Sequence, residues 1–200
     1  MWSAWTSTVG TCGQRSKAFG LPDLVAESTP LIEILSILRD RQRAFLLTSN
    51  RVDHIVTRGD LQKTPVRMFL FGLISLLEMQ LLRVILAHYP GERWRDYLDP
   101  KRVRKARRLQ SLREKRNEAL GLVDCLMLLD KLTVIRTNPE LREQMDLNDR
   151  PDGQGTLEAI EGLRNRVAHA NDLILGTSWP AVVDLVKQID KLLRQAERIE

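Results

Sequence analysis

Three residues in the last quarter of the chain combine the side chains that a phosphodiester-cleaving site requires. Arg164, Asn165 and His169 form the string R-N-x-x-x-H. Arginine carries a permanent charge on a planar fork that fits a phosphate, and histidine takes up and releases protons near neutral pH. Together they could cleave a phosphodiester without a metal, because the arginine would stabilise developing negative charge while the histidine moved protons.

A helix must position these side chains, and the apolar spacing around them predicts one. Four apolar residues recur at the three- and four-residue steps of one helix face: Leu157, Ile160, Leu163 and Val167. Thr156 is expected to cap this helix after the turn-forming run at 150–155. Residues five apart on a regular helix lie about 140° apart around its axis. A joint site for Arg164 and His169 therefore requires that the helix end or deform near His169, or that a second copy of the chain complete the site.

The same string also has a purely structural interpretation. Arg164 and Arg166 would then be solvated charges on the helix, and His169 a histidine at the helix end. The spacing alone is not specific, because the stretch 83–88 repeats R-x-x-x-x-H in a more apolar context. The polar Asn165 distinguishes the first string from the second.

The R-N-x-x-x-H string, on the third long helix of an all-helical C-terminal half, resembles the HEPN superfamily over roughly residues 68–198. Members of that superfamily are four- to five-helix bundles. Many are metal-independent endoribonucleases that act as toxins or defence effectors, whereas others bind RNA or partners without cutting. The resemblance implies that Arg164 and His169 are catalytic and that Asn165 supports them. It also implies a cleft shared by a homodimer, and an antitoxin or another regulatory partner.

The composition of the chain and its lack of known motifs narrow the classes of protein and of reaction that fit the sequence. The 200 residues are 43% apolar, which suffices for a globular core. Only Cys12 and Cys125 are present, so we expect no disulfide framework and a cytoplasmic protein. Residues 1–20 lack the pattern of a secretory signal and are expected to form a poorly ordered lead-in. The sequence has no zinc-ligand spacing, P-loop, dinucleotide fingerprint or G-x-S-x-G, so a metal-free reaction with no required cofactor is the enzymatic route it favours.

The segment 21–66 reads as a small α/β unit. The residues after Pro30 predict a helix, and the stretches 44–48 and 52–57 predict two strands joined by a turn at 49–51. A further helix is expected to open at Gly59-Asp60. A strand end beside a helix start is a favourable place for a phosphate or a ribose hydroxyl.

This unit resembles a CBS domain, a small regulatory module that usually works in pairs and often binds adenine nucleotides. The resemblance rests on S-T-P-L at 28–31 and I-V-T-R-G-D-L at 55–61. It implies that Thr57 contacts phosphate and Asp60 accepts from ribose hydroxyls of AMP or ATP, a regulatory ligand. His54 stands where a glycine is common, and only one copy of the module is evident. In the alternative interpretation, Thr57 caps the next helix and Asp60 stabilises its N-terminus.

The chain from Pro65 onward predicts helices. The stretch 69–87 is long and apolar enough to form a transmembrane helix, but Glu78 and Arg83 lie inside it. Since each charge near a bilayer centre costs about 2.5–3.5 kcal/mol, a buried bundle helix with no membrane contact is expected. Glu78 is expected to face Arg83 or another arginine. Further helices are expected at 118–133, 140–145 and from Val182.

The stretch 101–116 predicts a strongly basic helix with nine Lys or Arg residues and one Glu. Such a run is typical of a surface that binds phosphates. The expected RNA-binding residues are Lys101, Arg102, Arg104, Lys105, Arg107 and Arg108. No aromatic residue interrupts the run, so binding would depend on the RNA backbone and on salt. Alternatively, the cations form a solvated face over inward-facing Val103 and Leu109.

The sequence therefore predicts an α+β CBS-like unit (21–66) followed by an all-α, HEPN-like bundle of four to five helices (67–200). Three functions remain open. The first is a metal-independent ribonuclease gated by an adenine nucleotide. The second is a nucleotide-sensing protein whose helical half dimerises or binds RNA, and the third is an interaction protein without either site.

Overall fold

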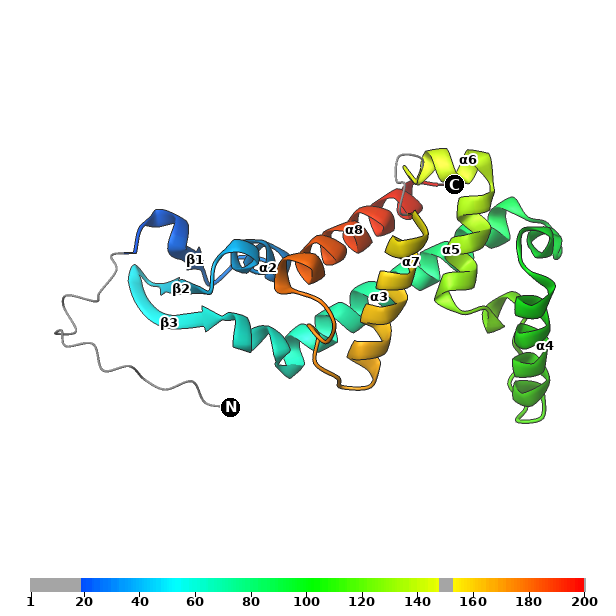
Figure 1. Ribbon diagram of the computed structural model, residues 1–200, viewed down its shortest axis with the longest axis horizontal. Coiled ribbons are helices and arrows are strands. Elements are labelled where there is room, and N and C mark those ends of the chain that lie inside the picture. The colour runs from blue at the N-terminus through cyan, green and yellow to red at the C-terminus, as the bar shows by residue number, and fades with distance from the viewer. Residues whose placement is uncertain (1–18, 148–152, 200) are drawn as a thin grey trace.

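The structure is a computed structural model that describes residues 19–147 and 153–199. Most of the expected lead-in at 1–20 lies outside the described residues. The elements of the N-terminal part are η1 (Leu21–Asp23), β1 (Leu24–Ala26), α2 (Leu31–Asp40), β2 (Arg43–Thr48), β3 (Arg51–Thr57) and η2 (Arg58–Gln62). The helical part contains α3 (Thr64–His88), η3 (Arg93–Tyr97), α4 (Pro100–Glu114), η4 (Val123–Cys125), α5 (Leu128–Thr137), α6 (Pro139–Gln144), α7 (Gly153–Ala168) and α8 (Trp179–Arg198). Figure 1 shows the sheet at one end of an elongated molecule and α4 at the other.

The N-terminal unit is a three-stranded sheet with one helix, which confirms the expected α/β character. The strands lie in the order β1-β2-β3, with β1 parallel to β2 and β2 antiparallel to β3. The hairpin turn uses Ser49 and Asn50, which both adopt positive φ angles, as tight hairpin turns require. Helix α2 connects β1 to β2 and buries Leu35 and Leu38.

Helix α3 is the central helix of the bundle and packs against α5, α7 and α8. Leu77, Leu81, Val84 and Ile85 on its inner side are fully buried. By length and composition alone α3 could cross a membrane. It nevertheless forms much of the core of this fold, as expected from its internal charges. Its outer side carries large apolar residues that are at least half exposed: Met68, Phe71, Leu76, Met79 and Leu86.

The two parts share one core. The buried apolar residues of the sheet and α2 belong to the same cluster as those of the bundle. Arg39 of α2 also donates two hydrogen bonds of 2.8 Å to the carboxylate of Asp184 on α8. The pKa of Asp184 is lowered, chiefly by the hydrogen bond from Arg39. This ion pair and the common core fix α2 against the first half of α8.

Three local predictions were wrong. Helix α7 begins at Gly153, so Thr156 lies inside it and does not cap it. The stretch 118–133 is not one helix, because Asn117 has a positive φ of 59° and α5 begins only at Leu128. The N-terminus of α5 is set by Asp130, whose carboxylate accepts a hydrogen bond of 3.2 Å from the Met127 amide.

The third error concerns the partner of Glu78, which is a lysine. Glu78 lies 2.7 Å from the Nζ atom of Lys131, a residue of α5 whose side chain is only 4% exposed. Arg83 instead donates to the backbone oxygen of Ala196 at 2.6 Å and to Gln80 at 2.8 Å. The ion pair therefore joins α3 to α5 inside the bundle.

Candidate functional site

Helix α7 ends next to the histidine of the R-N-x-x-x-H string. Its last residue is Ala168, and Ala170 adopts a left-handed φ of 54°. The amide of Ala170 donates to the oxygen of Val167 at 3.4 Å, and the amide of Asn171 donates to the oxygen of Arg166 at 3.0 Å. This pair of hydrogen bonds is the Schellman motif that closes many helices. His169 is therefore the first residue beyond the helix, and its side chain is exposed at the corner.

The other two motif residues lie close to each other on the last turns of α7. Nη1 of Arg164 donates a hydrogen bond of 3.3 Å to Oδ1 of Asn165. Arg164 is half-buried, whereas Asn165 is exposed. The backbone oxygen of Asn165 accepts the amide of His169 at 3.0 Å. Within residues 19–147 and 153–199, however, no hydrogen bond links the side chains of Arg164 and His169.

A hydrogen-bond network holds the turn after His169 against the start of α3. Nη2 of Arg67 donates to the oxygen of Asn171 at 2.7 Å, and Nη1 lies 3.5 Å from the oxygen of Arg166. Nε of Arg67 donates to the backbone oxygen of Gln62 at 2.9 Å. The side chain of Gln62 accepts the amide of Leu173 at 3.1 Å and donates to Asp172. No local sequence signal identifies Gln62 or Arg67 as part of this network, because their partners between Arg166 and Leu173 lie about 100 residues away in the chain.

A groove lies beside this helix end, between α3 and α7. Its volume is about 340 Å³ and it is lined by Arg67, Met68, Phe71, Gly72, Val167 and Ala168. Met68 is 69% exposed and Phe71 is 52% exposed. Arg164 lies one helical turn before Ala168, on the same side of α7. Arg164 and His169 do not line the groove, but Ala168, which does, directly precedes His169 in the chain.

Thr57 and Asp60 lie at the end of β3, as expected, and they bind each other. Oδ2 of Asp60 accepts from the amide of Thr57 at 2.7 Å and from its hydroxyl at 2.8 Å, while Oδ1 lies 2.6 Å from Nζ of Lys63. The Lys63 contact and the two Thr57 hydrogen bonds lower the pKa of Asp60 to about 2. In this arrangement Thr57 and Asp60 cap η2, and a nucleotide would have to displace Lys63 to reach Asp60.

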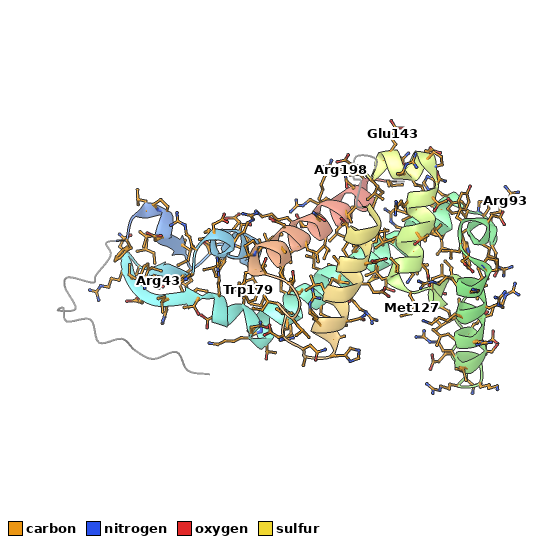
Figure 2. All side chains as sticks on the ribbon, viewed as in Figure 1. Arg43, Arg93, Met127, Glu143, Trp179 and Arg198 are labelled. Carbon is orange, nitrogen blue, oxygen red and sulfur yellow. The ribbon has the colours of Figure 1, made fainter. Side chains whose placement is uncertain are left out.

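The predicted basic surface is the solvent side of α4. Val103 and Ala106 face inward, and all six expected RNA-binding residues are exposed. Arg102 lies 3.3 Å from the buried carboxylate of Asp130, so this residue fastens α4 to α5. For the other five, no ion pair is found in the described part of the chain. Arg104 and Arg107 also line a depression of about 390 Å³ with Arg95. Figure 2 shows the long side chains of α4 extending into solvent.

The basic surface and the motif are separate in space. In Figure 1, α5 lies between α4 and α7. Helix α4 packs mainly against η4, and α7 against α3, α5 and α8. An RNA that touches both sites must therefore extend along the molecule past α5.

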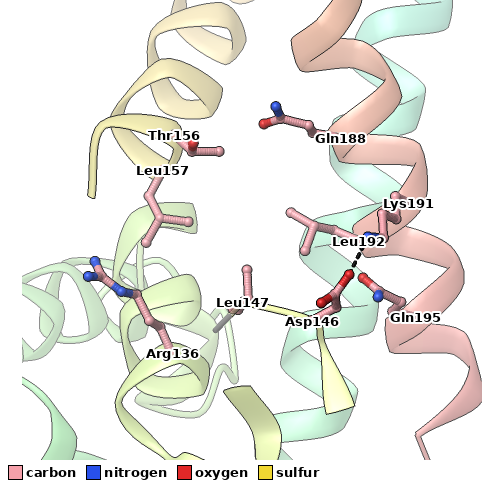
Figure 3. Close-up of a pocket in the computed structure, with 9 residues that line it drawn as sticks. All are labelled: Arg136, Asp146, Leu147, Thr156, Leu157, Gln188, Lys191, Leu192 and Gln195. Atoms are coloured by element: carbon pink, nitrogen blue, oxygen red, sulfur yellow. Dashed lines mark hydrogen bonds and ion pairs between the residues drawn. The ribbon is translucent and has the colours of Figure 1, made fainter. Parts of the chain in front are cut away.

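A second cavity lies at the opposite end of α7. It holds about 30 Å³, is lined by Thr156, Leu157 and residues of α5 and α8, and is bordered by the ion pair between Lys191 and Asp146 (Figure 3). This volume accommodates only about one or two water molecules. It is remote from His169 and does not belong to the candidate site.

No group of three or more His, Cys, Asp or Glu side chains that could hold a metal ion is found within the described ranges. Comparison with models of known protein families, with curated proteins and with solved structures finds no match for this chain. The function proposed below therefore depends on the residues and contacts described above.

Proposed function

We propose that the protein is a metal-independent endoribonuclease of the HEPN type, with Arg164, Asn165 and His169 at its active site. The observation that carries this proposal is the end of α7. Because the helix stops at Ala168, His169 is exposed at a corner whose backbone Arg67 holds in place. A histidine that is accessible, and fixed at its backbone, can meet a substrate that a mid-helix histidine could not reach.

In the proposed reaction, His169 moves the protons and Arg164 stabilises the charge. The imidazole removes the proton of an RNA 2′-hydroxyl, whose oxygen attacks the adjacent phosphorus and expels the 5′-oxygen of the next nucleotide. A protonated imidazole donates a proton to that leaving oxygen. The guanidinium of Arg164 binds the phosphorus oxygens as negative charge develops, and Asn165 orients the guanidinium. The products are a 2′,3′-cyclic phosphate and a 5′-hydroxyl, so DNA is not cut.

We propose a homodimer, because one proton-transfer group must act as base and another as acid. A second His169 from a partner copy would supply the second group. The exposed apolar side of α3 supports association, since contiguous apolar surface on a soluble protein often marks an interface. Leu76, Met79 and Leu86 are 50%, 63% and 53% exposed. An antitoxin or regulatory protein that covers the same side would compete with the dimer. A cytoplasmic location, without a membrane, fits an RNA substrate.

Regulation by an adenine nucleotide is proposed at Thr57 and Asp60. Helix η2, which these residues cap, ends at Gln62, and Gln62 binds the turn that follows His169. A nucleotide that displaced Lys63 from Asp60 would disturb η2, and this change could pass through Gln62 to His169. Lys63 directly follows Gln62 in the chain, and Gln62 accepts a hydrogen bond from the Leu173 amide. This short path supports the coupling.

The decisive experiment is cleavage of a labelled single-stranded RNA in excess chelator. We expect the wild type to produce a cyclic phosphate, and His169→Ala and Arg164→Ala to lose the activity by at least a hundredfold. His88→Ala is the matched control, because His88 ends the other R-x-x-x-x-H string and should leave the rate unchanged. A substrate with a 2′-deoxy sugar at the cut should resist. Equal cleavage by the wild type and His169→Ala would refute the proposed ribonuclease activity.

A second candidate function is nucleotide sensing without cleavage, which would use Thr57 and Asp60, adjacent to each other at the end of β3, once Lys63 is displaced. A ligand that binds only the folded state must raise the melting temperature. We expect AMP or ATP to stabilise the wild type, and Asp60→Ala to lose this shift. If millimolar nucleotide left the melting temperature unchanged, both nucleotide gating of the ribonuclease and nucleotide sensing would be ruled out.

A further inference from the structure

The groove between α3 and α7 combines a half-exposed aromatic ring with nearby positive charge. Phe71 and Met68 line it on α3 together with Arg67, whose guanidinium is held by Gln62 and Asn171 but keeps its positive charge. Arg164 lies one helical turn above Ala168 on the same side of α7, and His169 follows Ala168. None of the residues that line this groove in the described structure is a carboxylate.

From this arrangement we infer that the groove is a nucleobase subsite, which binds the base next to the phosphate that Arg164 and His169 contact. The inference deepens the proposed ribonuclease function and depends on it for the identity of the ligand as RNA. Unpaired bases stack on aromatic side chains, and their phosphates require cations at a short distance. A groove with apolar lining residues and the positive charge of Arg67 beside them satisfies both requirements, whereas an acidic peptide would not need Phe71 and a cationic partner would be repelled.

Gly72 keeps the groove open. A side chain added at Gly72 would meet no atom within 4 Å, so nothing in the fold requires a glycine at this position. Glycine inside a helix usually costs about 0.5–1 kcal/mol relative to alanine. The unfilled space lies directly beside Phe71, where a base could stack on the ring.

The test is the binding of a single-stranded RNA that carries 2′-deoxy sugars and therefore cannot be cut. A series of oligonucleotides each lacks one base at a different position. We expect Phe71→Ala to weaken binding of the intact oligonucleotide by about tenfold. Removal of one particular base should weaken binding to the wild type by a similar factor and should leave binding to Phe71→Ala unchanged. Phe71→Trp should restore the affinity and its dependence on that base.

Two further variants separate the groove from the surrounding surface. Gly72→Leu should fill the groove and weaken binding, while Gly72→Ala should have a much smaller effect. Phe19→Ala is the matched control, since Phe19 is an aromatic residue that is 50% exposed but does not line the groove. It should leave RNA binding unchanged.

Three results would overturn the proposed base-binding subsite: no binding of the RNA by the wild type, equal effects of Phe71→Ala and Phe19→Ala, or additive effects of Phe71→Ala and every base removal. The proposed base-binding subsite would also be overturned if the wild type sedimented as a dimer and Phe71→Ala as a monomer. The groove would then be a contact with a second copy of the chain. A different result is expected if the proposed ribonuclease activity is wrong but the base-binding subsite is right. In that case wild type and His169→Ala would cleave equally, while the position-specific effect of Phe71→Ala on binding would remain.

Discussion

The guanidinium of Arg67 donates a hydrogen bond of 2.7 Å to the backbone oxygen of Asn171, 104 residues further along the chain. This bond connects the first turn of α3 to the turn that carries His169. The same guanidinium also binds Gln62, at the end of η2. One side chain therefore joins the N-terminal α/β unit, the central helix of the bundle and the candidate active site.

The first prediction concerns this connection. Arg67→Met should lower the free energy of unfolding by about 2 kcal/mol, because hydrogen bonds from a charged group contribute about 1.5–3 kcal/mol. It should also reduce RNA cleavage by more than the lost stability explains, since the backbone around His169 is no longer held. Chemical denaturation and initial rates at a temperature where the variant is fully folded would measure the two effects.

Arg58→Met is the control for Arg67→Met. Arg58 likewise donates to two backbone oxygens, those of Leu38 at 2.9 Å and Arg39 at 2.7 Å, at the end of α2. A similar loss of stability with unchanged cleavage is expected. If both variants reduced cleavage equally, Arg67 would have no specific role in positioning His169.

The second prediction concerns the ion pair between Lys131 and Glu78. Glu78→Leu should cost about 3 kcal/mol, because it leaves the buried ammonium of Lys131 without its partner. Lys131→Met should cost less, since the side chain of Glu78 is 30% exposed and can remain hydrated. The double variant should be close to the wild type in stability. Urea unfolding of the four proteins measures the coupling, and equal costs of the two single variants would contradict this account.

The third prediction is the pH dependence that Asp60 contributes. Its pKa is lowered from an ordinary value of 3.8 to about 2, mainly by Lys63 and then by Thr57. The folded state therefore favours the charged form, and the stabilisation is complete above about pH 5. It should disappear as the pH falls from about 4 to 2, because the carboxylate is then protonated in the folded protein as well.

Asp60→Asn provides the comparison for this pH effect. The difference in unfolding free energy between the wild type and Asp60→Asn should be constant from pH 7 to 5 and should shrink between pH 4 and 2. Lys63→Gln should reduce the pH dependence, because the hydrogen bond from Lys63 is the largest cause of the shift. A difference that stays constant down to pH 2 would show that Asp60 has no lowered pKa.

The fourth prediction concerns the cations of α4. Each phosphate neutralised on a single strand contributes about 0.7 to the slope of log K against log salt. Replacing Arg104, Lys105 and Arg107 by Gln should therefore reduce the slope of RNA binding by about 2. Fluorescence anisotropy over a range of salt concentrations provides the measurement.

A charge-matched control removes three exposed cations from α8: Lys187, Lys191 and Arg194. Lys191 and Arg194 already pair with Asp146 and Asp190. The slope should change little in this triple variant. Equal changes in the two triple variants would mean that RNA responds only to the net charge of the protein.

The sequence was most informative where local patterns decide the structure. The hairpin at 43–57, the long apolar helix and the amphipathic last helix follow from residue spacing and turn chemistry. Ser178 caps α8, its hydroxyl accepting the Ala181 amide at 3.4 Å. The start of α7 was misplaced because two glycines and a glutamine occupy its first turn, where composition favours a loop.

The candidate site was only partly predictable. Its chemical residues belong to one short string, but the residues that surround them come from distant segments. Arg67 and Phe71 lie in a stretch whose apolar composition suggests only a core helix. The left-handed backbone at Ala170 also has no clear sequence signal, because alanine rarely adopts it.

The ion pair between Arg39 and Asp184, together with the common core, has a consequence for folding. Among the residues that the structure describes, the buried apolar side chains of the N-terminal unit belong to the same core as those of the bundle. Neither part should therefore be able to melt while the other stays native, and calorimetry should record a single cooperative transition. Recombinant fragments divided near residue 63 should accordingly behave as partially folded or aggregating polypeptides instead of autonomous modules.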